Sequence, residues 1–285
     1  MSFSPVVPLP GLAGWRFLDR TGEAQRAAFV KNPALERDTT YFRSKVAEIG
    51  SAEALVSDRR LMQVALGAFG LDADINNRFF IRKVLEDGTV ARDALANRLS
   101  DKRYLALARA FGLGDPGSLR TAEPGFADSI VRAFEDRQFE VAIGRQDENL
   151  RLALNMEREL PRLASATTSE RARWFGVLGD PPLRRVFETA FGLPPSFAAI
   201  DLDRQVDTLQ ARSRAAFGTD KLEELAAPDR REALIRRFLL RGQFGAESAG
   251  SAPASAALAL LRSPRWPGGA VNLPPPIVVP SLTRL

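Results

Sequence analysis

One short segment, Ala-Phe-Gly-Leu, occurs three times in this chain and constrains its fold more than any other feature. The copies stand at 68–71, 110–113 and 190–193, and a weaker copy, Ala-Phe-Gly-Thr, stands at 216–219. An aspartate precedes the phenylalanine of each full copy by 10 or 11 residues. Between the aspartate and the phenylalanine, apolar residues recur with the 3.6-residue period of an amphipathic helix. The pattern predicts a helix that begins at the aspartate and ends at the phenylalanine.

The residues at both ends of each predicted helix suit the capping of a helix. A carboxylate at the first position accepts hydrogen bonds from free N–H groups and suits the helix dipole. Glycine adopts the left-handed conformation that closes a helix, and the leucine after it can pack against the last turn. We therefore predict structural caps, with no ligand role, at Asp58, Asp101, Asp180, Gly70, Gly112 and Gly192.

Helical periodicity extends over most of the chain. Less regular stretches lie at 23–31, 37–48, 78–86, 127–142, 148–160, 169–177 and 201–217, and a regular one lies at 230–241. No segment alternates polar and β-branched residues as a strand would. A degenerate copy of the repeated block starts at Asp147, and the opening aspartates fall at spacings typical of helical repeats. The sequence predicts an all-α, multihelical body with internal pseudo-repeats of short helices.

Changes in composition divide the chain into three parts. Residues 1–20 form a Pro- and Gly-rich N-terminal segment, and residues 21–245 carry the helical pattern. A linker-like stretch at 112–125 suggests two lobes within the helical part, at about 21–115 and 125–245. Residues 246–285 are rich in Ala, Ser and Pro, which predicts a mostly disordered, low-complexity tail. Residues 255–262 could form a short helix within the tail.

The composition narrows the classes of function. The chain has no histidine and no cysteine, which excludes Ser-His-Asp and Cys-His catalysis and thiolate metal sites. It has 40 basic and 35 acidic residues, a net charge of +5, and both signs are interleaved along the chain. We therefore predict that the protein is not an enzyme and has no catalytic residue, cofactor or metal ion.

Two motifs resemble known sites but lack the features that those sites need. Residues 112–117 match the glycine spacing of a dinucleotide site, but they follow a predicted helix rather than a strand. Residues 72–83 begin like a calcium loop, yet Asn77 replaces the glycine and Lys83 the bidentate glutamate. We interpret this second segment as a polar turn in which Asn76 or Asn77 caps the next helix.

No apolar run has the length that spans a bilayer, and the N-terminus lacks the basic region of a secretory signal. We therefore expect a cytoplasmic protein without a membrane span. A non-cleaved export signal of a specialised secretion system would escape this test. The oligomeric state stays open.

The repeated segments and their neighbours resemble a known bacterial family. The matching stretches include "RDTTYFRSKV" at 37–46, "SDRRLMQVALGAFGLDADINNRFFIRKVLEDGT" at 57–89 and "RRVFETAFGLPPSFAAIDLDRQ" at 184–205. They resemble the domain-of-unknown-function family 1217 of alphaproteobacteria, over roughly residues 5–245. The resemblance implies an all-α protein with internal repeats, and it implies no catalytic residue. Genes of this family often lie among flagellar genes.

Three functional hypotheses remain. The first is a non-enzymatic interaction protein associated with flagellar assembly or motility, whose partner is an unknown flagellar protein. The second is a basic nucleic-acid-binding regulator, which the arginine excess and the pI of about 10 suggest. The third is an unrecognised enzyme that uses carboxylates or lysine.

Overall fold

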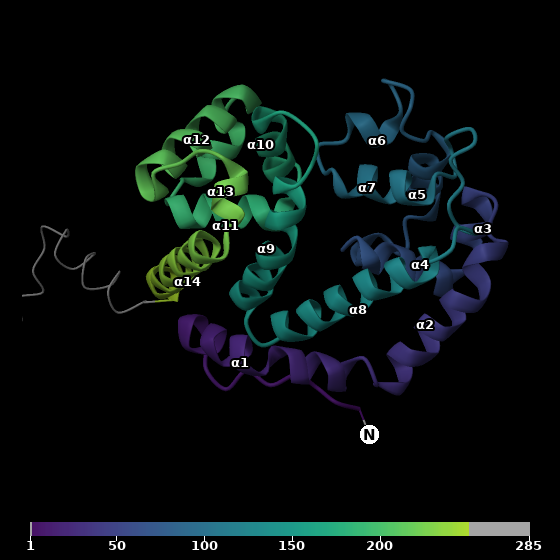
Figure 1. Cartoon of the computed structure of the whole chain (residues 1–285), viewed down its shortest axis with the longest axis horizontal. Coiled ribbons are helices and arrows are strands. Elements are labelled where there is room, and N and C mark those ends of the chain that lie inside the picture. Colours follow the sequence, from purple (N-terminus) through teal and green to yellow (C-terminus); the bar gives the residue numbers. More distant parts are fainter. Residues whose placement is uncertain (1, 251–285) are drawn as a thin grey trace, which may run out of the picture. The chain divides into compact units, whose positions relative to one another are not determined.

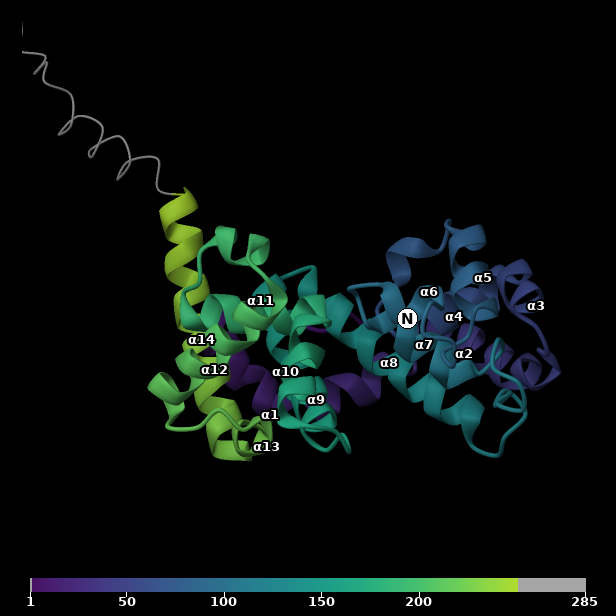
Figure 2. The same ribbon diagram turned by 90° about the horizontal axis from the view of Figure 1, so that it is seen from above.

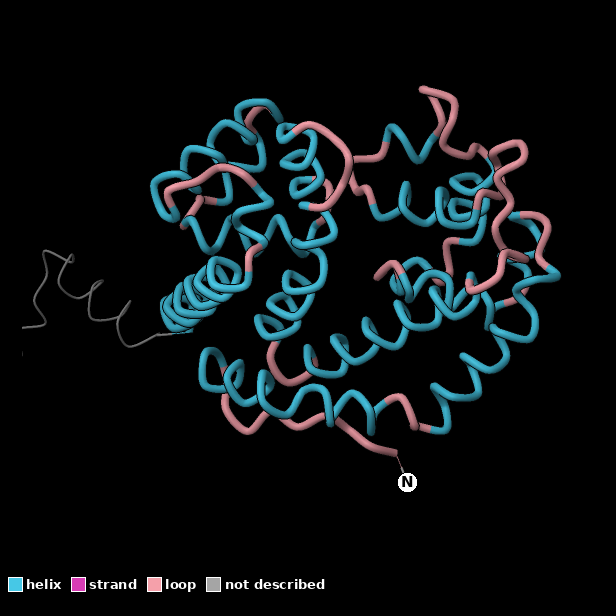
Figure 3. Tube along the Cα trace, viewed as in Figure 1, coloured by secondary structure: helices cyan, strands magenta, loops and turns pink. Residues whose placement is uncertain are grey.

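The computed structural model describes residues 2–250, and for residues 244–250 it describes the helical backbone alone. Figure 3 shows helices and loops in this range and no strand, so the predicted all-α class is confirmed for the described chain. The first seven helices are α1 (Gly11–Phe29), α2 (Pro33–Lys45), α3 (Ala52–Ser57), α4 (Arg59–Ala68), α5 (Arg78–Glu86), α6 (Leu95–Arg98) and α7 (Arg103–Phe111). The others are α8 (Phe126–Gly144), α9 (Glu148–Ala164), α10 (Glu170–Leu178), α11 (Pro181–Phe191), α12 (Leu202–Phe217), α13 (Leu222–Ala226) and α14 (Pro228–Gly250).

The chain up to Gln243 forms one compact unit that contains two large apolar clusters. The first core takes its side chains from α2–α5, α7 and the first half of α8, and the second core from α1, the second half of α8 and α9–α14. Helix α8 leads from one core to the other, as Figures 1 and 2 show. Ile130 and Phe134 pack in the first core, and Phe139 and Ile143 in the second.

The two cores therefore meet within a helix and not within the loop 112–125 that we expected to separate two lobes. That loop packs against the first core, because Thr121 is buried there and donates a hydrogen bond to the carbonyl oxygen of Ile49 at 2.7 Å. Nor is the segment 1–20 separate from the helical body. Helix α1 begins at Gly11, and Trp15 and Leu18 are buried in the second core.

The cores are built on the same local plan. Ser51 is the N-cap of α3 and Ser169 is the N-cap of α10, and each hydroxyl accepts a hydrogen bond from the N–H group three residues on. In both cores an aspartate-capped helix follows, α4 in the first and α11 in the second. An arginine then binds the alanine carbonyl of the repeated segment: Arg137 binds Ala68 and Arg237 binds Ala190. Helices α3 and α4 in the first core and α10 and α11 in the second are therefore similar helical groups, while the third copy of the segment ends α7, which packs in the first core.

Helix α9 differs from the sequence expectation at its C-terminal end. The predicted helix stopped at residue 160, but α9 runs through Pro161 to Ala164, and the N–H of Ser165 closes its last turn on the carbonyl oxygen of Pro161. At the other end, the carboxylate of Asp147 caps α9 through the N–H groups of Asn149 and Leu150. The extra turn matters because it carries Arg162, which lies beside a buried glutamate.

The predicted tail, 246–285, lies outside the described residues from residue 251 on, and so does the candidate helix at 255–262. Helix α14 continues to Gly250, inside the predicted tail. Among the residues that the structure describes, none of the helices combines the length and the apolar character that crossing a membrane requires.

Candidate functional site

The three aspartates of the repeated block occupy different environments. Asp58 is the N-cap of α4 and accepts hydrogen bonds from the N–H groups of Arg60 and Leu61, at 2.9 and 3.0 Å. Asp180 is the N-cap of α11, accepts a bond from the N–H of Leu183 at 3.0 Å, and is 7% exposed. Asp101 lies one residue before the N-cap position of α7, which Lys102 occupies. The carboxylate of Asp101 accepts a hydrogen bond from the backbone N–H of Arg103, two residues later.

The three glycines have left-handed backbone conformations, with φ of +69° at Gly70 and +64° at Gly112 and Gly192. After Gly70 and Gly192, the N–H of the next leucine bonds to the carbonyl oxygen five residues earlier, which is the Schellman arrangement. At Gly112 a single bond runs from its own N–H to the carbonyl oxygen of Ala108, the simpler left-handed cap. These contacts are made within the chain and require no ligand.

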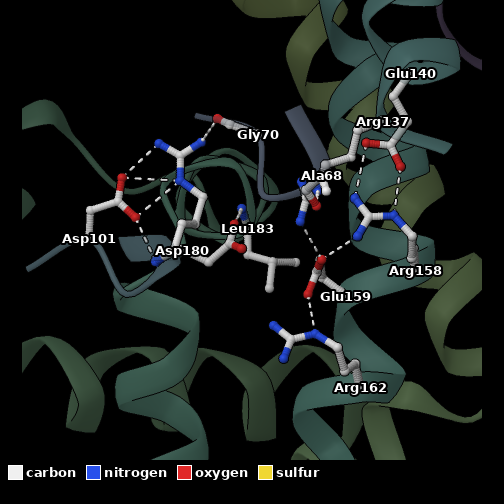
Figure 4. Close-up of polar contacts among 11 residues, drawn as sticks. Ala68, Gly70, Asp101, Arg137, Glu140, Arg158, Glu159, Arg162, Asp180 and Leu183 are labelled. Carbon is white, nitrogen blue, oxygen red and sulfur yellow. Dashed lines mark hydrogen bonds and ion pairs between the residues drawn. The ribbon is translucent and has the colours of Figure 1, made fainter. Parts of the chain in front are cut away.

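A cluster of charged side chains lies on α8 and α9, and we call it the charge network: Arg137, Glu140, Arg158, Glu159 and Arg162 (Figure 4). Arg137, Glu140 and Glu159 are buried, Arg158 is partly exposed, and Arg162 is exposed. Glu159 is 2% exposed and lies at the centre of the charge network. Its carboxylate accepts hydrogen bonds from the guanidinium groups of Arg137 at 2.7 Å and Arg162 at 2.6 Å, and from that of Arg158. Arg158 also pairs with Glu140, at 2.8 Å.

The charge network connects the two cores. Arg137 donates from Nε to the carbonyl oxygen of Ala68, at the end of α4 in the first core, while its Nη2 binds Glu159 of α9 in the second. Nearby, Arg103 donates to the carbonyl oxygen of Gly70 at 2.5 Å and pairs with Asp101 (Figure 4). The guanidinium groups thus bind the carbonyl groups at the end of α4, which the helix itself leaves without partners.

Burial and ion pairing act in opposite directions on the carboxyl groups of this region. Burial alone would raise the pKa of Glu159, but the positive charges of Arg158, Arg137 and Arg162 outweigh it and hold that pKa below its usual range. Burial raises the pKa of Asp180, and the N–H of Leu183 and the nearby arginines offset only part of the rise. The network therefore holds Glu159 as a carboxylate, which suits ion pairing rather than proton donation.

Asp58 and Asp180 have the same place in the two cores but opposite pKa shifts. Burial raises the pKa of Asp58, but hydrogen bonds from the hydroxyl of Tyr41 and the N–H groups of Leu61 and Arg60 outweigh burial and lower that pKa. The stabilisation by Asp58 is therefore present above the unfolded pKa of 3.8 and lost as the pH falls through the folded value. Asp180 contributes its full stability below 3.8 and loses it as the pH rises through its raised pKa.

We therefore expect Asp58→Asn and Asp180→Asn to have opposite pH dependences, because asparagine keeps the cap but cannot ionise. Asp58→Asn should destabilise at neutral pH, and its effect should shrink as the solution is acidified. The stability of Asp180→Asn relative to the unmodified chain should increase from about pH 4 to about pH 7. Urea-unfolding midpoints over this range and below it measure both effects. Parallel pH profiles for the two variants would contradict the assignment.

The structure also places the motifs that we rejected as sites. In the glycine-rich segment 112–117, the carboxylate of Asp115 accepts hydrogen bonds from the N–H and hydroxyl of Thr89 and the N–H of Val90, and so orders a neighbouring loop. Asn77 stands at the N-cap position of α5, but its side chain donates to Asp74 instead of capping the helix. The expected cap by Asn76 or Asn77 is therefore wrong. Within residues 2–250, no group of three or more acidic side chains is arranged to hold a metal ion.

Sequence reasoning did not find the charge network. Its one local signal is the position of Glu159, which follows Met156 by three residues on the buried face of α9, where an apolar residue is expected. A charged residue at such a position indicates a buried partner. Its buried partner, Arg137, lies on another helix, so the sequence pattern of α9 does not identify it.

Comparison with known proteins agrees with this fold. A family model described as "Protein of unknown function (DUF1217)" matches residues 68–230, more than half of the chain. The chain is also similar to the crystal structure of a protein from Agrobacterium tumefaciens that was a structural genomics target. The two chains are 26% identical with a TM-score of 0.67, and the similarity covers 84% of this chain and 98% of the other. No curated protein matches the chain.

Proposed function

The chain belongs to the DUF1217 family of proteins of unknown function, and we propose that it is a non-enzymatic interaction protein that serves flagellar assembly or motility. The flagellar part of the proposal rests on the resemblance stated above, because genes of this family often lie among flagellar genes. The partner is accordingly proposed to be a flagellar protein, and the protein is proposed to act in the cytoplasm or in association with the flagellum.

The charge network is the observation that supports an interaction role. The buried Arg137 binds both α4 and α9, and the partly exposed Arg158 joins α9 to α8. Apolar packing alone would not fix the direction of these contacts. A buried ion pair adds little to stability compared with apolar packing, so its benefit here is a defined arrangement of the two cores. A surface that spans two cores of fixed arrangement is preorganised, which lowers the entropic cost of binding a partner.

Recovery of partners from cells tests the proposal. We expect an affinity-tagged chain, expressed at its natural level in motile cells, to recover a flagellar component, and we expect a deletion strain to swim less than its parent. The control is a complemented strain, which should swim normally. Recovery of no flagellar component, together with normal swimming of the deletion strain, would contradict the proposal.

The same preparation distinguishes the nucleic-acid hypothesis. A nucleic-acid-binding regulator would retard DNA or RNA in a gel at low salt, and its affinity would fall steeply as salt is added. Under the interaction proposal we expect no such retardation. Salt-sensitive retardation without a flagellar partner would favour the regulator instead.

A further inference from the structure

A cleft of about 290 Å³ opens between α1, α8 and α9, on residues that the charge network does not use. Its floor is apolar and consists of Trp15, Leu18, Phe139 and Leu154. Its rim carries the charged side chains Asp19, Glu23, Arg26 and Glu157. Ligand pockets of small molecules begin at about 300 Å³, so the cleft has room for one long side chain rather than for a folded element.

The carboxylates of the rim make few ion pairs within the described part of the chain. Asp19 and Glu23 are one turn apart on α1, a like-charge pair that is unfavourable on an isolated helix, and neither makes an ion pair with any residue in the described part of the chain. Glu157 meets only Arg231, at 3.7 Å. Burial raises the pKa of Glu157, and the negative charges of Asp19 and Glu232 add to the rise, although the positive charges of Arg231 and Arg26 oppose part of it. The rim is therefore acidic in a chain whose net charge is +5.

Arg26, on the rim, is held by a carboxylate that lies outside the lining of the cleft and by the ring of Phe139 on its floor. Its Nη1 lies 2.6 Å from the carboxylate of Asp136, and its guanidinium carbon lies 5.4 Å from the centre of the Phe139 ring. An arginine held by a carboxylate and an aromatic ring gains from charge, hydrogen bonds and cation–π attraction together. Asp136 binds the guanidinium group of Arg26, so Asp19 and Glu23 have no ion-pair partner of their own within the described chain, and Glu157 has only the longer contact with Arg231.

We propose that this cleft binds an arginine side chain that a partner protein inserts, with the aliphatic stem on the apolar floor and the guanidinium among the three carboxylates. The inference rests on the proposed interaction function and names the chemistry of the partner's contact. Arginine fits better than lysine, because its planar group stacks on aromatic rings and binds carboxylates in pairs. Its entry also relieves the repulsion among the three carboxylates.

The indole N–H of Trp15 provides a direct readout, because it donates to Glu232 at 2.9 Å from the floor of the cleft. The chain has three tryptophans, so three indole signals appear in a proton–nitrogen spectrum of the full chain. We expect N-acetyl-arginine amide to shift the Trp15 signal saturably. We expect the uncharged isostere N-acetyl-citrulline amide to leave that signal unchanged at the same concentrations. Equal shifts by both probes, or no saturable shift by arginine, would overturn the proposal.

Charge-removing variants test which groups bind the probe. We expect Asp19→Asn, Glu23→Gln and Glu157→Gln each to raise the dissociation constant of N-acetyl-arginine amide about two- to fivefold, the range of partly exposed ion pairs. The matched control is Asp93→Asn, an exposed carboxylate in the loop before α6, which should leave the constant unchanged. Unchanged binding in all three rim variants, with their folds intact by circular dichroism, would also overturn the proposal.

Two further measurements separate the alternatives. If the arginines of this chain's own tail occupied the cleft, the full-length variant Arg262→Gln/Arg265→Gln/Arg284→Gln would bind the probe more tightly, and that outcome would overturn assignment to a partner. Recovery from motile cells is then compared between the unmodified chain and the triple rim variant. We expect the triple variant to lose the flagellar partner; if it recovers that partner as well as the unmodified chain does, the cleft inference fails and the proposed function stands. The remaining outcome is that the probe binds but the unmodified chain recovers no flagellar component. The proposed function then fails. The cleft would bind the arginine probe without a flagellar partner, which overturns the partner assignment.

Discussion

Replacing Glu159 with glutamine should lower the free energy of unfolding by about 3–5 kcal/mol, the cost of leaving buried charges without their partner. Glu159 is 2% exposed and receives hydrogen bonds from three guanidinium groups, and Arg137 on α8 is itself only 9% exposed. Glutamine keeps the shape of the side chain and removes its charge, so Arg137 would remain buried with no carboxylate in contact. Urea unfolding at neutral pH, followed by circular dichroism, measures the change.

Glu148→Gln is the matched control for this experiment, because Glu148 lies on the same helix and pairs with Arg151 at the surface. We expect a loss of less than about 1 kcal/mol there, as for other exposed pairs. The double variant Arg137→Met/Glu159→Leu should recover part of the loss, since it removes charge from both partners. If Glu159→Gln and Glu148→Gln both lowered the free energy of unfolding by the same small amount, the charge network would not be what holds α4, α8 and α9 together.

The second large effect is expected at Gly112. A Cβ atom added there would lie 1.8 Å from the carbonyl oxygen of Ser118, which is backbone and cannot rotate away, and the residue has a φ of +64°. We expect Gly112→Ala to cost about 2–4 kcal/mol, the sum of left-handed strain and a steric clash. Unfolding in urea measures it, with an intact far-ultraviolet spectrum as the check on the fold.

Gly70→Ala is the comparison for Gly112→Ala. Gly70 has the same left-handed conformation, but its added Cβ would meet nothing closer than Nη1 of Arg137, at 3.1 Å. We expect a loss of about 1 kcal/mol, from backbone strain alone. If the two alanine variants lost equal stability, the packing of the loop after Gly112 would not be what makes this glycine necessary.

The helices could be predicted from the sequence because their signals are local. Asp58 and Asp180 stand directly before an apolar stripe of period 3.6, and the glycine that ends each helix lies 12 residues later. Such signals depend on a few neighbouring residues, so they can be recognised in the sequence before the tertiary contacts are known. The expected cap by Asn77 was wrong for the complementary reason: its side chain had a second partner available, Asp74, three residues before it.

The division of the molecule into two cores could not be predicted in the same way. Helix α8 has a continuous apolar pattern, and nothing in that pattern indicates that Phe134 packs in one core and Phe139 in the other. The charge network was missed because its residues lie on two helices, and only the packing of α8 against α9 brings Arg137 to Glu159. The cleft likewise needs α1 beside α8 and α9, which are more than 90 residues further along the chain.

The sequence alone thus determined the ends of the helices that carry both an aspartate and a glycine signal, α4 and α11, because caps and amphipathic periodicity act over a single helix. The tertiary structure decided what the same local signal does. Asp58 and Asp180 are both N-caps of equivalent helices, yet hydrogen bonding lowers the pKa of the first, and burial raises the pKa of the second. The difference arises from the groups that surround each carboxylate in space, Tyr41 for Asp58 and the buried junction of the two cores for Asp180. A local pattern holds no information on either environment.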